Sequence, residues 1–328
     1  MKLIQLAYLC GIVDHGLNVS IAANALHTSQ PGISKQIRLL EDELGVDILI
    51  RRSNRIVGLT DQGQAIVTIA RRVLWETKNI RLVGGEGRTE RLHPISIATT
   101  YVHARYVLLP LITRFRARHP KVTFHIQQCS HDEILELVGN GGVDMGVSTL
   151  PKKPPEEIVA LPFLKLHRAL ITPRDHPLAK KQKVTLQDLA KYPMITSSTA
   201  QPTGITVLNA FRARKLVPDI VLSATDADVI KAYVEAGVGI AVLSAEAYDA
   251  KRDIGICAIN VDHLFEPLTS YITINRYSHL RSSIAEFIQL LSAKWTRDAV
   301  EAALKSNSPL GKTRHSRTAK KPRSASPR

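Results

Sequence analysis

The sequence predicts a mainly helical N-terminal region followed by a larger α/β region, and two patterns lead to this fold class. Through about residue 83, apolar residues recur at the three- and four-residue spacing of amphipathic helices, with one pair of β-prone runs among them. From about residue 92, strand-like runs alternate with helical patterns, as in βαβ units whose mostly parallel sheets are covered by helices. The 328 residues are enough to give each region its own core.

Two short helices separated by a tight turn are predicted near the N-terminus. Residues 19–26 are small or apolar at helical spacing, which suits a compact first helix. Thr28 or Ser29 can cap the second helix, and Pro31 suits its first turn because the N–H that proline lacks would have no helical partner there. This second helix is expected over residues 30–44, with a glycine directly after it.

The second helix has one apolar and one polar face. Its buried face is expected to consist of four aliphatic residues at helical spacing, namely Ile33, Ile37, Leu40 and Leu44. The residues at and near its start can bond base edges and phosphates in a DNA major groove. They are Ser29, Gln30, Pro31, Ser34, Lys35 and Arg38. This pattern is typical of a helix that reads DNA, although three packed helices with a solubilising polar surface would share it.

A β-hairpin is expected after this helix, because two β-prone runs within residues 48–59 flank Ser53 and Asn54. Its arginines would lie beside DNA phosphates or enter a minor groove, where contacts position a protein without reading sequence. They are Arg51, Arg52 and Arg55. The net charge of +15 is weaker evidence for DNA binding, since residues 305–328 alone contribute +8. The clustering of basic side chains on the second helix and the hairpin is more informative.

Three blocks of this region resemble the winged helix-turn-helix of LysR-type transcriptional regulators in both residues and spacing. They are residues 28–37 (TSQPGISKQI), 40–45 (LEDELG) and 59–63 (LTDQG). The resemblance implies that residues 1–59 form a DNA-binding domain for double-stranded promoter DNA, in a homodimer or homotetramer, with RNA polymerase as a further partner. A symmetric dimer also doubles the length of palindromic DNA that is read.

A long helix is predicted over residues 61–83, with Thr60 as its cap. Its apolar residues fall on one narrow stripe that consists of Ile66, Ile69, Ala70, Val73, Thr77 and Ile80. A helix of this length with such a seam usually packs against a partner helix. The resemblance likewise implies a dimerisation helix, within a linker and hinge that span residues 60–91. Packing of the helix on its own domain is the alternative.

Residues 92–300 are similar to the effector-binding domain of LysR-type regulators, which shares its architecture of two Rossmann-like subdomains with bacterial periplasmic binding proteins. Subdomain I is expected at about residues 92–164 and 268–296, and subdomain II at about residues 165–267. Seven strands are expected, at residues 93–98, 122–127, 143–148, 169–172, 220–224, 239–243 and 271–275. Residues 301–328 are expected to be a basic disordered tail, which either solubilises the protein or adds nonspecific DNA affinity.

Hydroxyl side chains gather in four segments where strands are expected to give way to helices, at residues 97–101, 146–149, 197–204 and 225–228. Ligands of such folds bind where the carboxyl ends of strands meet helix N-termini. Hydroxyls and free helix N–H groups can bind a tetrahedral oxyanion without a full positive charge. Each segment alone is readily explained as a helix cap, but four of them together predict a pocket for a small anion.

Several segments of the α/β region resemble the CysB-like branch of the family, which governs sulfur assimilation. They are residues 97–100, 104–106, 175–178, 202–204 and 225–234. Threonines in the cleft of that branch contact a bound sulfate, and the matching positions here are Thr100, Thr149 and Thr203, with Thr99 as a further candidate contact. The resemblance implies that a sulfate-like anion or a sulfur metabolite controls binding to promoters of cysteine or sulfonate genes.

This chain departs from the branch at two places in the cleft. Val102 and His103 stand where the branch usually carries a threonine and a glutamine, and Leu166 stands where it has an aromatic residue. The loss of a hydroxyl and the gain of an imidazole change the number of donors and the pH response. We hypothesise that His103 contacts the ligand; a surface or capping histidine is the alternative. A sulfur metabolite other than sulfate then becomes a candidate ligand.

Several function classes find no support in the sequence. No segment approaches the roughly 18 consecutive apolar residues of a membrane span, so we expect no membrane partner and a cytoplasmic, nucleoid-associated protein. Cys10, Cys129 and Cys257 lie far apart, which favours reduced thiols over disulfides or a zinc site. No hydrolase, phosphate-loop or dinucleotide motif occurs in its required context, so we expect no enzyme, cofactor or metal. A LysR-type regulator of an unrelated pathway, and less so a solute-binding protein, remain the alternatives.

Overall fold

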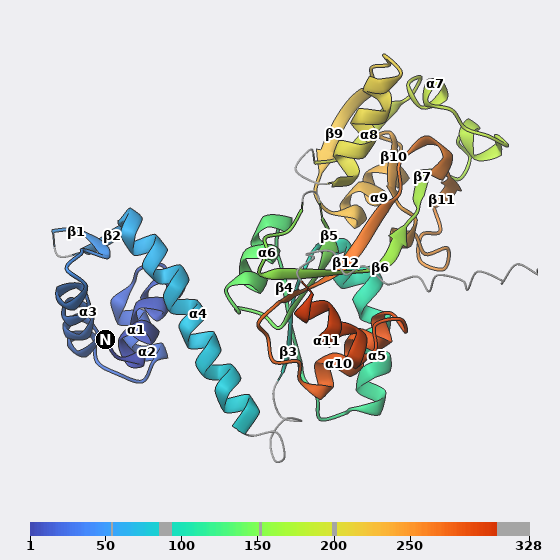
Figure 1. Ribbon diagram of the computed structural model, residues 1–328. Helices are drawn as coiled ribbons and strands as arrows, with labels where there is room; N and C mark the ends of the chain where they lie inside the picture. The colour runs from blue at the N-terminus through green and yellow to red at the C-terminus, as the bar shows by residue number, and fades with distance from the viewer. Residues whose placement is uncertain (54, 85–93, 151–152, 199–201, 307–328) are drawn as a thin grey trace, which may run out of the picture.

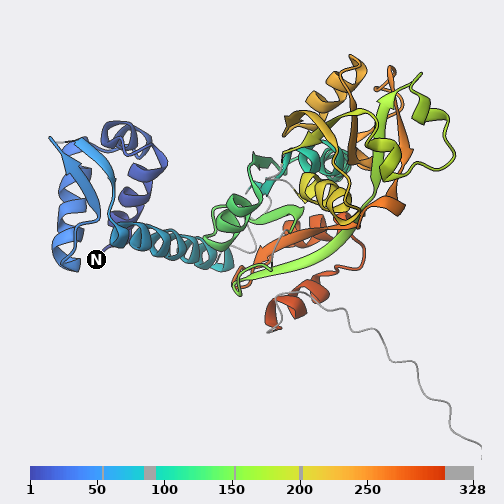
Figure 2. The same ribbon diagram turned by 90° about the horizontal axis from the view of Figure 1, so that it is seen from above.

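The computed structural model describes residues 1–53, 55–84, 94–150, 153–198 and 202–306. Figure 1 shows a small N-terminal domain, the long helix α4 (Asp61–Gly84) and a larger α/β domain in chain order. Figure 2 shows that α4 leads from the first domain to the second. This arrangement confirms the predicted fold class. Asn54, residues 85–91 of the predicted hinge and residues 307–328 of the predicted tail lie outside the described residues.

The N-terminal domain is a three-helix unit with a β-hairpin. Its elements are α1 (Leu3–Asp14), α2 (Val19–Ala25), α3 (Gln30–Leu44), β1 (Leu49–Arg52) and β2 (Arg55–Leu59). The two strands pair antiparallel, as the hairpin prediction requires. Ile33, Ile37 and Leu40 are buried against Leu9 and Ile48, so α3 turns its predicted apolar face inward. The helix ends at Gly45, whose φ of 68° lies in the left-handed region that glycine tolerates.

One member of the predicted apolar face is wrong. Leu44 is 40% exposed, whereas Glu41, one turn earlier, is only 6% exposed. The Glu41 carboxylate accepts hydrogen bonds from the backbone N–H groups of Ile48 and Leu49, at 2.9 and 3.1 Å, where the chain enters β1. These two bonds to buried N–H groups explain why the Glu41 carboxylate is buried, which the apolar periodicity of the helix did not predict.

Helix α4 is anchored by Thr60, whose hydroxyl accepts from the Gly63 N–H at 2.9 Å. Part of the predicted apolar seam faces the N-terminal domain, and part of it faces solvent. Ala70 of this seam is buried against the N-terminal domain, together with Val67, which was not predicted. Ile66 and Val73 are partly buried there, so this part of the helix packs on the chain's own domain. Ile69 and Ile80 are 61% and 70% exposed. These two isoleucines stand about three helical turns apart and so share one outward face.

The α/β domain contains two five-stranded sheets. The first has the order β4 (Phe124–Gln128), β3 (Ile95–Thr99), β5 (Met145–Thr149), β12 (Leu268–Asn275) and β6 (Ile158–Leu166). The second has the order β11 (Ile256–Asn260), β7 (Arg168–Pro173), β10 (Ile240–Ser244), β8 (Pro193–Ser197) and β9 (Asp219–Ala224). The chain crosses between them at His167 and returns before Leu268.

Each sheet is mixed, which corrects the expectation of mostly parallel sheets. In the first sheet β3 runs parallel to β4 and β5, whereas β12 runs antiparallel to β5 and β6. The second sheet has the same division: β8 is parallel to β9 and β10, and β7 is antiparallel to β10 and β11. The antiparallel strands are the ones that carry the chain between the two sheets. Three of the ten strands, β6, β8 and β11, were absent from the predicted set.

Helices cover both faces of each sheet. A π-helical segment, η2 (His103–Leu108), leads into α5 (Leu109–Arg118), and α6 (His131–Gly139) lies on the opposite face of the first sheet. The second sheet is covered by α8 (Pro202–Ala213) and α9 (Ala227–Glu235) on opposite faces. Shorter turns complete the domain: η3 (Pro177–Lys180), α7 (Leu186–Leu189), η4 (Ala245–Ala247) and η5 (Asp262–Leu264).

The C-terminal end of the domain differs from the prediction. After α10 (Ser282–Leu291) a second helix, α11 (Arg297–Lys305), begins at the cap residue Thr296 and buries Val300, Ala303 and Leu304 against the first sheet. The assignment of residues 301–305 to a disordered tail is therefore wrong. The apolar residues of α11 recur at helical spacing and belong to the core.

No single described helix is long and apolar enough to span a membrane; α1 and α2 reach that length only as a pair bent by 120°, and both contribute to the N-terminal core. The three cysteines are free thiols. Burial raises the pKa of Cys10 to about 11, so this thiol is a packing group rather than a reactive one.

Candidate functional sites

The N-terminal domain presents a groove between α3, the start of α2 and the hairpin. It has a volume of about 920 Å³ and is lined by seven of the nine residues predicted to contact DNA. These are Gln30, Pro31, Ser34, Lys35, Arg38, Arg51 and Arg55. Ser29 and Arg52 are exposed but lie outside the lining. The fold thus gathers on one surface side chains from a helix and a hairpin that are separated by about twenty positions in the sequence.

The start of α3 is held in a defined geometry. The Ser29 hydroxyl caps the helix by accepting from the Gly32 N–H at 3.2 Å. The Gln30 amide donates to the Ser34 hydroxyl at 3.3 Å, so these two polar side chains of the groove are held together. Asn18, which the sequence argument did not single out, caps α2 and also lines the groove. An asparagine directly before a short helix is the signal that could have identified it.

Arg51 differs from its neighbours because its guanidinium is already paired. It forms a two-pronged ion pair with Glu41, with nitrogen–oxygen distances of 2.7 and 3.1 Å. Burial would raise the pKa of Glu41, but the hydrogen bonds from Arg51 and from the N–H groups of Leu49 and Ile48 outweigh it and lower the pKa. Arg51 therefore has a structural partner, whereas Arg52 and Arg55 project into solvent as exposed side chains.

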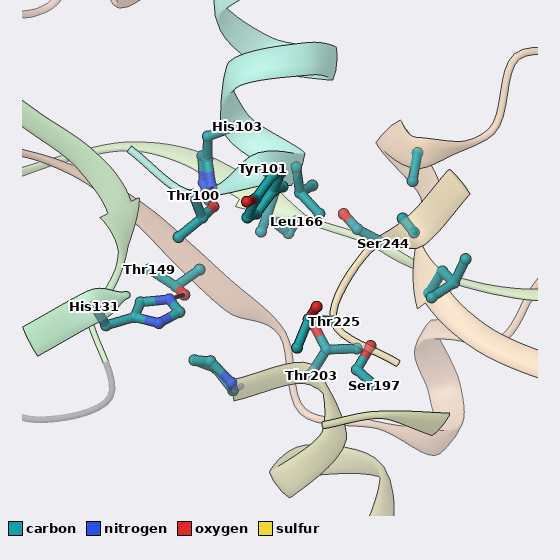
Figure 3. Close-up of a pocket in the computed structure, with 15 residues that line it drawn as sticks. Thr100, Tyr101, His103, His131, Thr149, Leu166, Ser197, Thr203, Thr225 and Ser244 are labelled. Atoms are coloured by element: carbon teal, nitrogen blue, oxygen red, sulfur yellow. Dashed lines mark hydrogen bonds between the residues drawn. The ribbon is translucent and has the colours of Figure 1, made fainter. Parts of the chain in front are cut away.

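The second site is a small cavity of about 50 Å³ between the two sheets of the α/β domain (Figure 3). The residues of its lining with a hydroxyl or an imidazole come from segments next to both sheets: Thr100, Tyr101, His103, His131, Thr149, Ser197, Thr203, Thr225 and Ser244. Among the described residues that line it, none is Lys, Arg, Asp or Glu. Among the predicted contacts, Thr100, His103, Thr149 and Thr203 are brought together here. The cavity therefore offers hydroxyls and imidazoles, rather than full charges, to a ligand.

Thr99 is not part of this cavity. It is fully buried at the end of β3, and its hydroxyl donates to the Val147 carbonyl oxygen on the neighbouring strand at 2.7 Å. Successive strand residues point to opposite faces of a sheet, so Thr99 and Thr100 leave the strand end in different directions. The proposed role of Thr99 as an effector contact finds no support in this geometry.

His103 is buried at the start of η2, so the alternative of a surface histidine is wrong. It is 3% exposed, its Nδ1 lies 2.8 Å from the Thr100 hydroxyl, and its Nε2 lies 2.7 Å from the Ser270 hydroxyl. Burial, and secondarily the nearby His131, lowers the pKa of His103 to about 3. Both ring nitrogens are therefore engaged by the protein, and the ring is neutral at physiological pH. His103 lines the cavity, and the hypothesis that it contacts the ligand stays a prediction.

His131 is a cavity residue that the sequence argument missed. It opens α6 directly after the cap residue Ser130, and its Nε2 lies 3.0 Å from the Thr149 hydroxyl. Burial lowers its pKa, against a smaller opposing effect of Asp132. The capping pattern of Ser130 and Glu133 at the carboxyl end of β4 was a usable signal. The partner, Thr149, is 18 residues away and follows only from the fold.

The backbone at Gly204, next to Thr203, lies very close to the backbone at Ser197. A Cβ atom at Gly204 would lie only 2.3 Å from the Ser197 carbonyl oxygen, so glycine is required for α8 to start this close to the end of β8. As a result Ser197 and Thr203, one from a strand end and one from a helix start, face the same cavity (Figure 3).

Beside the cavity, ionic contacts join elements of the two sheets. Arg105 of η2 pairs with Asp228 at the start of α9 at 2.6 Å, and the Tyr106 hydroxyl donates to the same carboxylate. Lys231 pairs with Asp228 at 3.1 Å and with Asp253 at 3.0 Å. Within the described residues, no group of three or more His, Cys, Asp or Glu side chains is arranged to hold a metal ion.

Comparison with known families gives two matches that together cover most of the chain. Residues 3–64 match the bacterial regulatory helix-turn-helix protein, lysR family, and residues 89–296 match the LysR substrate binding domain. The HTH-type transcriptional regulator CysB of Haemophilus influenzae is 40% identical over 92% of this chain and 94% of its own length. SsuR of Burkholderia cenocepacia, also an HTH-type transcriptional regulator, is 38% identical over 89% of this chain and 95% of its own length.

Solved structures agree with these matches. The cofactor-binding domain of the Cbl transcriptional regulator covers 65% of this chain and 94% of that chain, with 32% identity and a TM-score of 0.61. Full-length CbnR in complex with its target DNA covers 89% of this chain and 99% of that chain, with a TM-score of 0.63; at 22% identity this likeness concerns the fold alone.

Proposed function

This chain belongs to the LysR family of bacterial transcriptional regulators, and we propose that it controls sulfur-metabolism genes in response to a small oxyanion or sulfur metabolite. One observation carries the proposal: Thr100, Thr149 and Thr203 converge on a single cavity. These positions match the sulfate contacts of the CysB-like branch, and relatives that bear the names CysB, SsuR and Cbl support the same branch.

The groove of the N-terminal domain is the surface that we assign to promoter DNA. Gln30 and Ser34 stand at the exposed start of α3, where a recognition helix reads base edges in a major groove. Arg52 and Arg55 of the hairpin suit contacts to phosphates, which set the register without reading sequence. The exposed face of α4 that carries Ile69 and Ile80 is available to a second copy, as dimeric binding to a palindrome requires.

Helix α6 offers a route from the cavity to the linker helix. His131 at its start bonds Thr149 in the cavity, and Gly141, just beyond its end, lies against Trp75 of α4, where a Cβ atom would come within 2.0 Å of the indole ring. A ligand shifts the arrangement only if it binds two states with different affinity. Trp75→Ala would then preserve anion binding but remove its effect on DNA binding; an unchanged effect would rule out this route.

The finer parts of the proposal concern partners and location. As a regulator of promoters, the protein would act in the bacterial cytoplasm at the nucleoid and contact RNA polymerase, and its role is regulatory rather than catalytic. A LysR-type regulator of another pathway is the second candidate. It is favoured by Leu166, Val102 and His103, which change the walls of the cavity relative to the CysB-like branch.

Selection of genomic fragments by the purified protein tests the proposal, with and without sulfate, thiosulfate, O-acetylserine and adenosine phosphosulfate. We expect enrichment of palindromic sites upstream of sulfur genes, altered by at least one of these compounds. Enrichment of other promoters would keep the DNA role and discard the sulfur assignment. Ser34→Ala is the matched control for DNA reading, and it should relax sequence choice by about 1–3 kcal/mol at one position.

A further inference from the structure

The Thr100 hydroxyl is the cavity group whose hydrogen-bond direction the structure determines. Its partner within the described residues is His103 Nδ1 at 2.8 Å, and the other ring nitrogen lies 2.7 Å from Ser270 Oγ. Thr100, His103 and Ser270 thus form a chain of three groups that leads from β12 in the first sheet to the cavity. A neutral imidazole has one donor nitrogen and one acceptor nitrogen, so the chain can run in only two directions.

The burial of Ser270 selects one of these directions. Its side chain is fully buried, and among the described residues the hydroxyl has no partner other than His103. If Nε2 carried the imidazole hydrogen and donated to Ser270, the hydrogen of the Ser270 hydroxyl would have no acceptor. A buried donor without an acceptor is unfavourable. The Ser270 hydroxyl therefore donates to Nε2, and the imidazole hydrogen is on Nδ1.

The consequence for the cavity follows directly. The Nδ1–H donates to the Thr100 oxygen, so the hydrogen of the Thr100 hydroxyl is left to point elsewhere, and the cavity is the space that this residue lines. The low pKa of His103, about 3, is consistent with a ring that stays neutral in this chain.

We propose that Ser270 and His103 are positioning residues that orient the Thr100 hydroxyl as a hydrogen-bond donor to the bound effector. The inference rests on the proposed function of the cavity and specifies its ligand: the ligand atom that meets the Thr100 hydrogen is a hydrogen-bond acceptor, as every oxygen of sulfate and the oxygens of a sulfonate or thiosulfate are. Because the hydroxyl is oriented before the ligand arrives, the anion does not have to reorganise it on binding.

The pair of His131 and Thr149 shows what Ser270 contributes to the pair of His103 and Thr100. His131 Nε2 also meets a threonine hydroxyl, but in the described part of the chain no hydrogen bond to the other ring nitrogen fixes the tautomer of that ring. The hydrogen of the Thr149 hydroxyl can therefore point to His131 or to a ligand, whereas the hydrogen of the Thr100 hydroxyl points away from His103. Both threonines contact a histidine, and they differ in whether a buried serine fixes the tautomer of that histidine.

A double-mutant cycle on the full chain tests the proposal, with sulfate and thiosulfate as probes and calorimetry as the readout. Ser270→Ala should weaken anion binding roughly threefold to tenfold, the worth of one ordinary hydrogen bond. The same substitution in a Thr100→Val background should have no further effect on anion binding, because Ser270 acts only through that hydroxyl. An undiminished effect in the Thr100→Val background would overturn the proposal.

Ser148→Ala is the matched control. Ser148 is also a fully buried serine of the same sheet, directly before Thr149, but its hydroxyl has no hydrogen-bond partner among the residues that the structure describes. The change should leave anion affinity within twofold of the wild type. A loss equal to that of Ser270→Ala would mean that packing, rather than hydroxyl orientation, is being measured.

A second measurement does not depend on the ligand. Nitrogen NMR of the full chain with labelled histidine, with the His103 signal assigned by its absence from His103→Gln, should show the hydrogen on Nδ1. A hydrogen on Nε2 would overturn the proposal. If neither probe anion binds the wild-type protein, the proposed function of the cavity loses its support, and the NMR result still decides whether Thr100 is oriented.

Discussion

The DNA groove and the effector cavity both suit oxyanions, but they are built in opposite ways. The groove presents full positive charges, Lys35, Arg38 and Arg55, on a surface open to solvent and salt. The cavity presents hydroxyls and neutral imidazoles in a small space between the two sheets, and no Lys or Arg is among the described residues that line it. Exposed charges act over a distance and are screened by ions, whereas neutral donors act only in contact and are hardly screened.

This difference explains why the two sites can serve one regulator. DNA offers phosphates at regular spacing on a large surface, so strength comes from many weak, salt-sensitive contacts. A small effector offers a few oxygen atoms, so discrimination must come from the geometry of individual donors such as Thr100. A buried lysine or arginine would bind many anions strongly, while oriented hydroxyls favour the one whose oxygens they reach.

The largest expected effect is the acid sensitivity that His103 gives to the effector domain. Its folded pKa of about 3 lies below the ordinary value of 6.5, so the unfolded chain binds the proton more readily. The stability that this group contributes is complete above about pH 6.5 and is lost as the pH falls toward 3, by up to about 1.4 kcal/mol per pH unit. Urea unfolding followed by tryptophan fluorescence should show a shallower pH slope for His103→Gln.

The same His103 measurement has a second arm. Because the ring stays neutral, anion binding by the wild type should not change between pH 6 and 8 through this residue. A change in that range that His103→Gln abolishes would show that the imidazole titrates in the folded protein. The DNA groove contains no counterpart, since its cations are lysine and arginine side chains.

Glu41 provides the next largest effect, in the N-terminal domain. Glu41→Ala leaves the N–H groups of Ile48 and Leu49 and the guanidinium of Arg51 without their carboxylate, and should lower the free energy of unfolding by about 3 kcal/mol. Because the folded pKa of Glu41 is lowered, this stability is present above the ordinary carboxylate range and lost in acid. Asp42→Ala, at an exposed neighbour, should change little in circular-dichroism urea titrations.

Thr100 and Thr99 allow the sharpest test of the cavity. Thr100→Val should weaken effector binding about tenfold to a hundredfold, as loss of a hydrogen bond to a charged group does, while DNA binding without effector stays unchanged. Thr99→Val removes a hydroxyl that bonds Val147, so it should affect stability but spare effector binding. Equal losses of effector binding for both variants would restore Thr99 as a contact.

Local pattern was sufficient for much of the DNA-binding half. The cap at Ser29, the proline in the first turn and the glycine after Leu44 all act within a few residues, so the sequence contains the whole cause of α3. The resemblance then supplied the function. The prediction failed in burying Leu44 and not Glu41. The burial of Glu41 depends on two N–H groups at the entry to β1, which the periodicity of the helix does not reveal.

The effector half was less predictable because its decisive contacts are long-range. β6 contains Pro162, which a central strand would not tolerate, but β6 is an edge strand of its sheet. β8 begins with Pro193 and shows its strand character only after that residue. The pairing of His131 with Thr149, and of His103 with Ser270, joins residues 18 and 167 positions apart. Residue types predicted a pocket of hydroxyls, but not which side chains hydrogen-bond to those hydroxyls and orient them.

The smallest expected effect separates two arginines on the same hairpin. Arg55 is exposed and lines the groove, so Arg55→Ala should weaken binding to all DNA sequences about equally and reduce the slope of log affinity against log salt by about one. Arg51 is held by Glu41, so Arg51→Ala should leave this slope unchanged and instead lower the stability of the N-terminal domain. Fluorescence anisotropy titrations at several salt concentrations, with a specific and a scrambled duplex, measure both. If Arg51→Ala changes the slope as much as Arg55→Ala does, the ion pair opens on DNA. Arg51 would then be a phosphate contact. The Glu41 carboxylate would compete with DNA phosphates for the Arg51 guanidinium, besides stabilising the start of the hairpin.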